Sequence, residues 1–220
     1  MGIRIKICGI TREEDAAAAV ASGAHALGFI LYPKSPRYVS PERAAEILAT
    51  VPPYVERVAV VVNPSAEEVR RIAGIAPFSQ WQLHGAESPA LMAEIREAGS
   101  HPYRFVKALH LPFEGGARGL AAYATAGAGA FLLDTPCVEH GGSGKTFDWN
   151  LVEGFRMENV SNVPIILSGG LTADNVGEAV TRVRPYAVDV SSGVESAPGI
   201  KDPIKIERFI SRCLTASLPA

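Results

Sequence analysis

Eight short runs of β-branched and other apolar residues recur along this 220-residue chain, with helix-like stretches between them. The runs span residues 3–7, 26–30, 57–62, 79–82, 104–107, 130–133, 164–167 and 187–190. One strand in about 27 residues matches the length of a β-α pair in a small closed barrel. The alternation therefore predicts a single-domain α/β protein, a (β/α)8 or TIM barrel formed by residues 1–220.

Helix-start signals support this alternation. N-cap residues are followed by proline or glutamate at the positions that such caps favour. The pairs are Thr11 with Glu14, Ser40 with Pro41, Ser65 with Glu68, and Asp202 with Pro203. An open doubly wound sheet is the alternative, but it usually carries Gly-x-Gly-x-x-Gly after the first strand. Here residues 8–12 read Cys-Gly-Ile-Thr-Arg, and no composition break indicates a second domain.

Charge and cysteine content exclude several functional classes. The 21 basic and 23 acidic residues give a net charge of −2, which predicts neither nucleic-acid nor membrane binding over the whole surface. No apolar run is long enough to span a membrane. Cys8, Cys137 and Cys213 have unrelated spacings, which favours a reducing compartment and a cytoplasmic location. A monomer and a homodimer both remain open.

Cys8 stands where the first predicted strand gives way to a helix, at the edge where α/β barrels keep their chemistry. Backbone amides and a helix N-terminus can lower the pKa of a thiol there, so we expect Cys8 to act as a base or nucleophile. The alternative is a small buried hydrophobic residue, the common state of a free cysteine.

Asp134 ends a buried strand, and strand alternation places it on the same side as Leu132. That side is predicted to be the inside of the barrel mouth. A partly desolvated carboxyl group there suits a general acid, although a capping role is an equal alternative. Cys8 and Asp134 on distant strands can flank one small substrate from opposite sides, an arrangement that suits an isomerisation.

Two glycine-rich turns follow the last two predicted strands. One contains Gly169 and Gly170, and the other contains Ser192 and Gly193, where a short extra helix is expected. Glycine lets backbone amides approach an anion, and barrels often bind phosphate at this place. Together the turns predict a phosphate site, although each alone is an ordinary turn.

Long loops after the second and sixth predicted strands, residues 31–40 and 134–148, are candidates for function. Arg37 lies in the first of them, stiffened by Pro33 and Pro36, and can clamp a carboxylate with two hydrogen bonds. The alternative is a solvated surface arginine. The glycine-rich residues 141–144 are expected either to close the second loop over the pocket or to form an ordinary connection.

Other polar residues lie in or beside the strands. Asp189 is expected to bind substrate hydroxyls, to orient the phosphate turn, or to have a structural role. His84 lies on the same face as Gln82 and is expected to support the pocket. Lys6 and Lys107 are candidates to neutralise buried carboxylates. The five histidines show no spacing typical of a metal site, so no metal is predicted.

The chain resembles the phosphoribosylanthranilate isomerase family of tryptophan biosynthesis, over residues 3 to about 210. The motifs that carry this resemblance are KICGIT at 6–11, GF at 28–29, SPRYV at 35–39, QLHG at 82–85, LD at 133–134, GGSGKTFDW at 141–149, LSGGL at 167–171 and DVSSGVE at 189–195. The resemblance implies a barrel enzyme that performs an Amadori rearrangement of a small phosphorylated substrate. No cofactor is implied, because the reaction needs neither a redox step nor an electron sink.

The resemblance also implies roles for residues. Cys8 would be the general base and Asp134 the general acid, with Arg37 on the anthranilate carboxylate. The amides around Gly169–Gly170 and Ser192–Gly193 would hold the phosphate. Cys137 is expected to be inert and Cys213 to pack in the final helix.

Another sugar-phosphate isomerase of the same fold remains as an alternative. A sugar-phosphate epimerase requires histidine and aspartate metal ligands at strand ends, which are missing, and the indole-forming synthase requires a set of lysines and glutamates that the strand ends do not supply. A related isomerase of histidine biosynthesis uses aspartate where Cys8 stands, so the cysteine argues against that enzyme. A non-catalytic phosphate-binding barrel would need neither Cys8 nor Asp134.

Overall fold

A computed structural model describes residues 2–98, 104–134, 150–159 and 162–217. Eight parallel strands close into a barrel in the order β1 to β8, with β1 also paired to β8. They are β1 (Arg4–Cys8), β2 (Ala26–Ile30), β3 (Glu56–Val61), β4 (Gln80–Leu83), β5 (Phe105–His110), β6 (Ala128–Asp134), β7 (Ile165–Leu167) and β8 (Ala187–Val190). The predicted barrel is confirmed, with strand boundaries displaced by a few residues.

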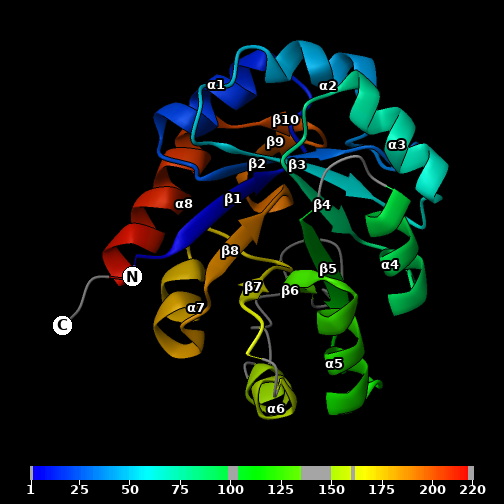
Figure 1. The fold of residues 1–220 in the computed structure, drawn as a ribbon. Coiled ribbons are helices and arrows are strands. Elements are labelled where there is room, and N and C mark those ends of the chain that lie inside the picture. Colours follow the sequence, from blue (N-terminus) through cyan, green and yellow to red (C-terminus); the bar gives the residue numbers. More distant parts are fainter. Residues whose placement is uncertain (1, 99–103, 135–149, 160–161, 218–220) are drawn as a thin grey trace.

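Helices follow the strands and form the outer layer of the barrel (Figure 1). They are α1 (Glu13–Ala21), α2 (Pro41–Leu48), α3 (Ala66–Ile75), α4 (Pro89–Ala98), α5 (Gly116–Ala126), α6 (Asn150–Glu158), α7 (Val176–Val183) and α8 (Pro203–Ala216). Among these described helices, none is both long enough and apolar enough to cross a membrane.

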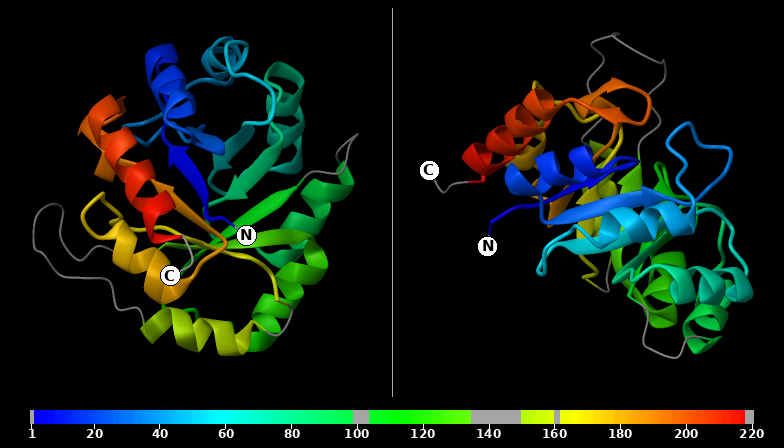
Figure 2. Two further views of the ribbon diagram at one scale, coloured as in Figure 1. Left: turned by 90° about the vertical axis from the view of Figure 1, so that its left-hand side faces the viewer. Right: turned by 90° about the horizontal axis from the view of Figure 1, so that it is seen from above.

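The chain between β8 and α8 adds a small structure of its own. A single 3-10 turn, η1 (Ser192–Val194), leads into the hairpin of β9 (Glu195–Ala197) and β10 (Ile200–Lys201). The short extra helix expected after the eighth strand is therefore present. Figure 2 shows the hairpin at the end of the barrel opposite to the two chain termini.

Strand alternation divides the buried side chains into two layers. One layer packs between the strands and the helices and includes Ile5, Ile7 and Phe131. The other fills the barrel itself and includes Val106 and Leu132. Period-two alternation thus sends every second residue of a strand inward, and it is this inner set that reaches the barrel mouth.

Three of the four predicted helix caps are confirmed. The side chains of Ser40, Ser65 and Asp202 each accept a backbone hydrogen bond at the start of a helix. The expected capping box of Thr11 is wrong. Helix α1 starts one residue later, with Arg12 at the N-cap and no side-chain cap. The Thr11 hydroxyl instead donates to the carbonyl of Gly199 in the β9–β10 hairpin, a contact that orients this side chain towards the hairpin.

Candidate active site

Cys8 is the last residue of β1 and points into the barrel, where it packs with Val58 and Val60 of β3. Its neighbour across the sheet is Gly28 of β2. A Cβ atom at Gly28 would lie 2.7 Å from the Cys8 sulfur and 2.9 Å from Cε of Lys6. The absence of a side chain at Gly28 is therefore what leaves room for the thiol.

The electrostatic surroundings of Cys8 differ from the sequence expectation. Burial raises the pKa of the Cys8 thiol, and the ammonium group of Lys6, which is hydrogen-bonded to the sulfur, lowers it only in part. The net pKa lies above the ordinary value, so the expected lowering is wrong for this structure. Cys8 is almost fully enclosed by distant strands, and desolvation of a thiolate outweighs the nearby positive charge.

Lys6 is the cation at the bottom of this site. Its Nζ lies 2.9 Å from Oδ1 of Asp189, and both side chains are buried. Burial lowers the pKa of Lys6, but Asp189 and Cys8 raise it to a net value above the ordinary one, which keeps the ammonium charged. The prediction that Lys6 neutralises a buried carboxylate is confirmed, and so is that for Lys107, whose Nζ lies 2.8 Å from Glu87.

A line of polar side chains leads from Lys6 across the barrel to Asp134. Lys6 Nζ donates to Oε1 of Gln82 at 2.9 Å, and Nε2 of Gln82 lies 2.7 Å from Nδ1 of His84. Nε2 of His84 lies 3.3 Å from Oδ2 of Asp134 at the end of β6. Gln82 and His84 share one face as predicted, and Asp134 shares the inner side with Leu132.

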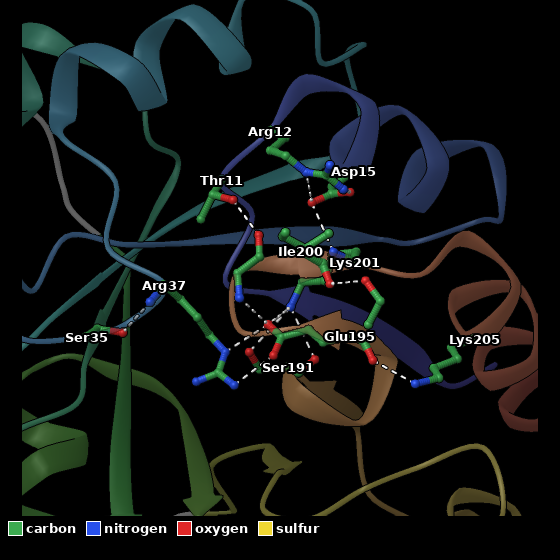
Figure 3. Close-up of polar contacts among 12 residues, drawn as sticks. Thr11, Arg12, Asp15, Ser35, Arg37, Ser191, Glu195, Ile200, Lys201 and Lys205 are labelled. Atoms are coloured by element: carbon green, nitrogen blue, oxygen red, sulfur yellow. Dashed lines mark hydrogen bonds and ion pairs between the residues drawn. The ribbon is translucent and has the colours of Figure 1, made fainter.

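Arg37 lies in the loop between β2 and α2, where it meets Glu195 of the hairpin (Figure 3). Nε and Nη2 of Arg37 donate to the two carboxylate oxygens of Glu195 at 2.8 Å and 2.7 Å. The alternative of a solvated surface arginine is therefore wrong, because this guanidinium is half-buried and fixed by a bidentate ion pair. Among its described contacts, the Nη1 side keeps its N–H groups for another acceptor.

Glu195 is the hub of this end of the site (Figure 3). Besides Arg37 it accepts from Nζ of Lys201 at 2.8 Å and from the backbone N–H of Gly199. Burial raises the pKa of Glu195, but the hydrogen bonds from Arg37 and Lys201 lower it below the usual range. Lys201 also donates to Ser191, directly before η1, so this cluster ties the Arg37 loop to the turn after β8.

The two glycine-rich turns lie against one another. Gly169 and Gly170 both adopt positive φ values, of 84° and 62°, which let the chain turn sharply after β7. A Cβ atom at Gly193 would overlap the carbonyl oxygen of Leu171, so only glycine allows η1 to pack this closely on the other turn. Ser168, just before Gly169, lies 3.5 Å from Asp189, which links Asp189 to this turn.

The other cysteines are separate from this cluster. Cys213 is buried in α8, and burial raises its pKa to about 12, which agrees with a packing role. Cys137 and the glycine-rich residues 141–144 lie outside the described residues. In the described parts of the chain, no group of three or more histidine, cysteine or acidic side chains is arranged to hold a metal ion.

Comparison with known proteins identifies the family. The model of the family described as N-(5'-phosphoribosyl)anthranilate (PRA) isomerase matches residues 5–212. The chain belongs to the phosphoribosylanthranilate isomerase family. An isomerase of this name from Dechloromonas aromatica (strain RCB) is 47% identical over 217 residues, with 96% of each chain covered.

Solved structures of phosphoribosylanthranilate isomerases share the fold. The structure from Thermotoga maritima is 44% identical, covers 96% of this chain and 98% of its own, and has a TM-score of 0.82. A second, in complex with reduced 1-(o-carboxyphenylamino)-1-deoxyribulose 5-phosphate, is 40% identical over the same shares, with a TM-score of 0.79. Another structure from Thermotoga maritima, 41% identical over the same shares with a TM-score of 0.78, is described as monomers generated from a dimeric phosphoribosylanthranilate isomerase.

In this member of the phosphoribosylanthranilate isomerase family, sequence reasoning missed Glu195 and Lys201 as site residues. Glu195 closes the motif after the eighth strand, but nothing local shows that it pairs with Arg37, 158 residues earlier. The signal that could have found the pair is the position of Glu195 just after the turn at Ser192–Gly193. A carboxylate in a segment that is expected to bind an anion needs a cationic partner to neutralise it.

Proposed function

We propose that this chain isomerises N-(5-phosphoribosyl)anthranilate to 1-(2-carboxyphenylamino)-1-deoxyribulose 5-phosphate, with Cys8 as general base and Asp134 as general acid. Membership in the family supports the reaction. One structural observation supports the roles. The two residues end strands β1 and β6 and are linked across the barrel mouth through Lys6, Gln82 and His84.

Asp134 begins the reaction by protonating the oxygen of the ribose ring. The bond between C1 and that oxygen breaks, and the lone pair of the anthranilate nitrogen forms a C1=N double bond. The product of this step is an open-chain Schiff base with a positive charge on nitrogen. A half-exposed carboxyl group at the mouth can give up its proton to a substrate bound above it.

Cys8 then removes the proton from C2 as a thiolate. The electrons of the C2–H bond form a C1=C2 double bond, and those of the C1=N bond return to nitrogen. The resulting enolamine becomes the ketose when its C2 hydroxyl loses a proton and C1 gains one. Lys6 beside the sulfur favours the thiolate that this step needs.

The two anionic ends of the substrate are assigned to different groups at the mouth: the carboxylate to Arg37 and the phosphate to backbone amides of the two glycine-rich turns. Arg37 offers its Nη1 side to the anthranilate carboxylate while Glu195 holds the other side of the guanidinium. Backbone amides near Gly169–Gly170 and Ser192–Gly193 receive the phosphate. Asp189 orients this turn through Ser168, and His84 supports Asp134.

The test is loss of anthranilate-type fluorescence when purified protein is added to freshly generated phosphoribosylanthranilate, without metal or cofactor. A fast decay, absent with heat-denatured protein, is the expected result. No decay with folded protein that still binds a phosphorylated sugar would contradict the proposed substrate and redirect the search to other aldose phosphates.

Oligomeric state and location stay predictions. Because a solved relative is described as a dimer, a homodimer is the state that we propose to test by analytical ultracentrifugation. Sedimentation as a particle of 23.3 kDa, the mass of a single chain, would contradict the homodimer. The cytoplasmic location rests on the sequence expectation alone.

A further inference from the structure

The orientation of the Gln82 amide is set by Lys6. The ammonium group of Lys6 can only donate hydrogen bonds, so the atom 2.9 Å from its Nζ must be the amide oxygen of Gln82. The same ammonium binds Asp189 and Cys8, which fix its position. Gln82 is 1% exposed and Lys6 6% exposed, so both groups are shielded from bulk solvent.

The amide of Gln82 in turn sets the tautomer of His84. With its oxygen towards Lys6, Gln82 presents an NH₂ group to Nδ1 of His84 at 2.7 Å. An amide nitrogen has no lone pair to offer, so Nδ1 must accept and the ring proton of neutral His84 resides on Nε2. Nε2–H then faces Oδ2 of Asp134 at 3.3 Å and donates to it.

We infer that Lys6 and Gln82 are positioning residues, which hold His84 as the Nε2–H tautomer so that it donates a hydrogen bond to Asp134. This inference rests on the proposed role of Asp134 as general acid. With Oδ2 engaged by His84, Oδ1 is the oxygen left to face the substrate, and the carboxylate formed by proton transfer keeps a hydrogen-bond donor. The opposite tautomer would present a lone pair to the carboxylate and repel it.

Lys6, Gln82 and His84 could have a purely structural role, as a satisfied set of buried hydrogen bonds. Stability measurements alone do not separate that role from the positioning of Asp134, but the direction of the hydrogen bonds does. A structural network requires only that each polar atom has a partner, whereas positioning of Asp134 requires the proton of His84 on Nε2. The tautomer and the turnover number are therefore the readouts.

The experiment uses protein labelled with ¹⁵N at histidine, and long-range ¹H–¹⁵N spectra report the tautomer of each ring. A His84→Asn variant assigns the His84 signals. We expect the Nε2–H pattern for His84 in the unaltered protein. A Gln82→Glu substitution replaces the donor facing Nδ1 by an acceptor, so His84 acquires a proton at Nδ1 and its ¹⁵N pattern changes.

The same Gln82→Glu variant should lose turnover by about tenfold or more, with KM changed by less than about threefold. Gln82→Met is apolar and similar in size, and it removes the group that imposes the tautomer on the His84 ring. Turnover should fall in this variant too. It also provides the test if Gln82→Glu does not fold. Gln80→Glu is the matched control, because it adds the same charge two residues earlier on β4. It should leave the His84 spectrum and kcat unchanged.

An Nδ1–H pattern in the unaltered protein, or full turnover in Gln82→Glu and Gln82→Met, would overturn the inference. Failure of the proposed function has a different signature. If Asp134→Asn keeps its turnover, the role of Asp134 fails, whereas the spectrum of His84 still reports whether Lys6 and Gln82 set its tautomer.

Discussion

The guanidinium of Arg37 and the carboxylate of Glu195 form a two-point ion pair, although 158 residues separate them in the chain. Glu195 also binds Lys201, which donates to Ser191 before the turn after β8. The residue assigned to the anthranilate carboxylate is thus held by the same hairpin that follows one of the turns assigned to the phosphate. Both anion sites depend on a segment outside the barrel strands.

Replacing Arg37 by alanine should weaken substrate binding. Loss of one charge-assisted contact costs about 1.5–3 kcal/mol, which corresponds to roughly a 10- to 150-fold rise in KM. Glu195 keeps Lys201 as a partner, so the fold should persist. Arg43→Ala is the control, since Arg43 is an exposed arginine paired with Glu13 and Glu46 on the outer surface. An unchanged KM in Arg37→Ala would refute the clamp.

Lys6→Met should destabilise the protein, because the Asp189 carboxylate would be left buried without its cation. Breaking a buried pair in this way costs about 3–5 kcal/mol in the free energy of unfolding, measured by urea denaturation. Adding Asp189→Asn should restore part of that loss but not the rate, since Cys8 and Gln82 still lack their donor. If Lys6→Met alone unfolds at the same urea concentration as the unaltered protein, the pair is not the electrostatic anchor described above.

Gly28→Ala should lower kcat as well as stability, because the added methyl group would press on the Cys8 sulfur and on Lys6. Overpacking of this kind costs about 1–3 kcal/mol. Gly74→Ala serves as the matched control. It lies in α3 with nothing within 4 Å of the added atom, and it should raise stability by about 0.5–1 kcal/mol with kcat unchanged. Normal kcat in a folded Gly28→Ala variant would show that the space beside the thiol is not needed.

The pH dependence follows from the burial of Cys8. Because burial raises the pKa of the thiol, the thiolate fraction is small at neutral pH and grows as pH rises. We expect kcat/KM to increase from about pH 7 to about pH 9, with alkylation of Cys8 by iodoacetamide following the same curve. The stability of the fold should change with pH in the opposite direction to kcat/KM. The folded protein holds the thiol proton of Cys8 more tightly than the unfolded chain does, so the neutral thiol contributes to stability at low pH, and this contribution is lost as pH rises through the pKa of Cys8 in the folded protein. A kcat/KM that declines over this interval would contradict the role of Cys8.

Much of the fold can be predicted from local sequence patterns. Alternating residues placed Leu132 and Asp134 on one side of β6, and Gln82 of β4 on the same side as His84, which directly follows that strand. The period of β-α units predicted the closed barrel, because each strand and helix is defined by residues close in sequence. Lys6 was recognisable as a partner for a buried carboxylate, since a lysine inside a strand needs one.

Contacts between residues far apart in the chain cannot be predicted from such local patterns. The sequence predicts Thr11 as a helix N-cap, but in the structure its hydroxyl donates to the carbonyl of Gly199, 188 residues away. Glu195 reaches Arg37 only because a short hairpin folds back over the barrel mouth. The pKa of Cys8 was misjudged for the same reason, since the strands that bury it are distant in the chain.

The central claim is that Cys8 and Asp134 transfer the protons of one isomerisation. The most direct test compares Cys8→Ala and Asp134→Asn for turnover of phosphoribosylanthranilate and for binding of reduced 1-(o-carboxyphenylamino)-1-deoxyribulose 5-phosphate. We predict that each variant binds this analogue within about threefold of the unaltered protein while kcat falls by about 10²- to 10⁴-fold. Either variant retaining its kcat would contradict the assignment of that residue.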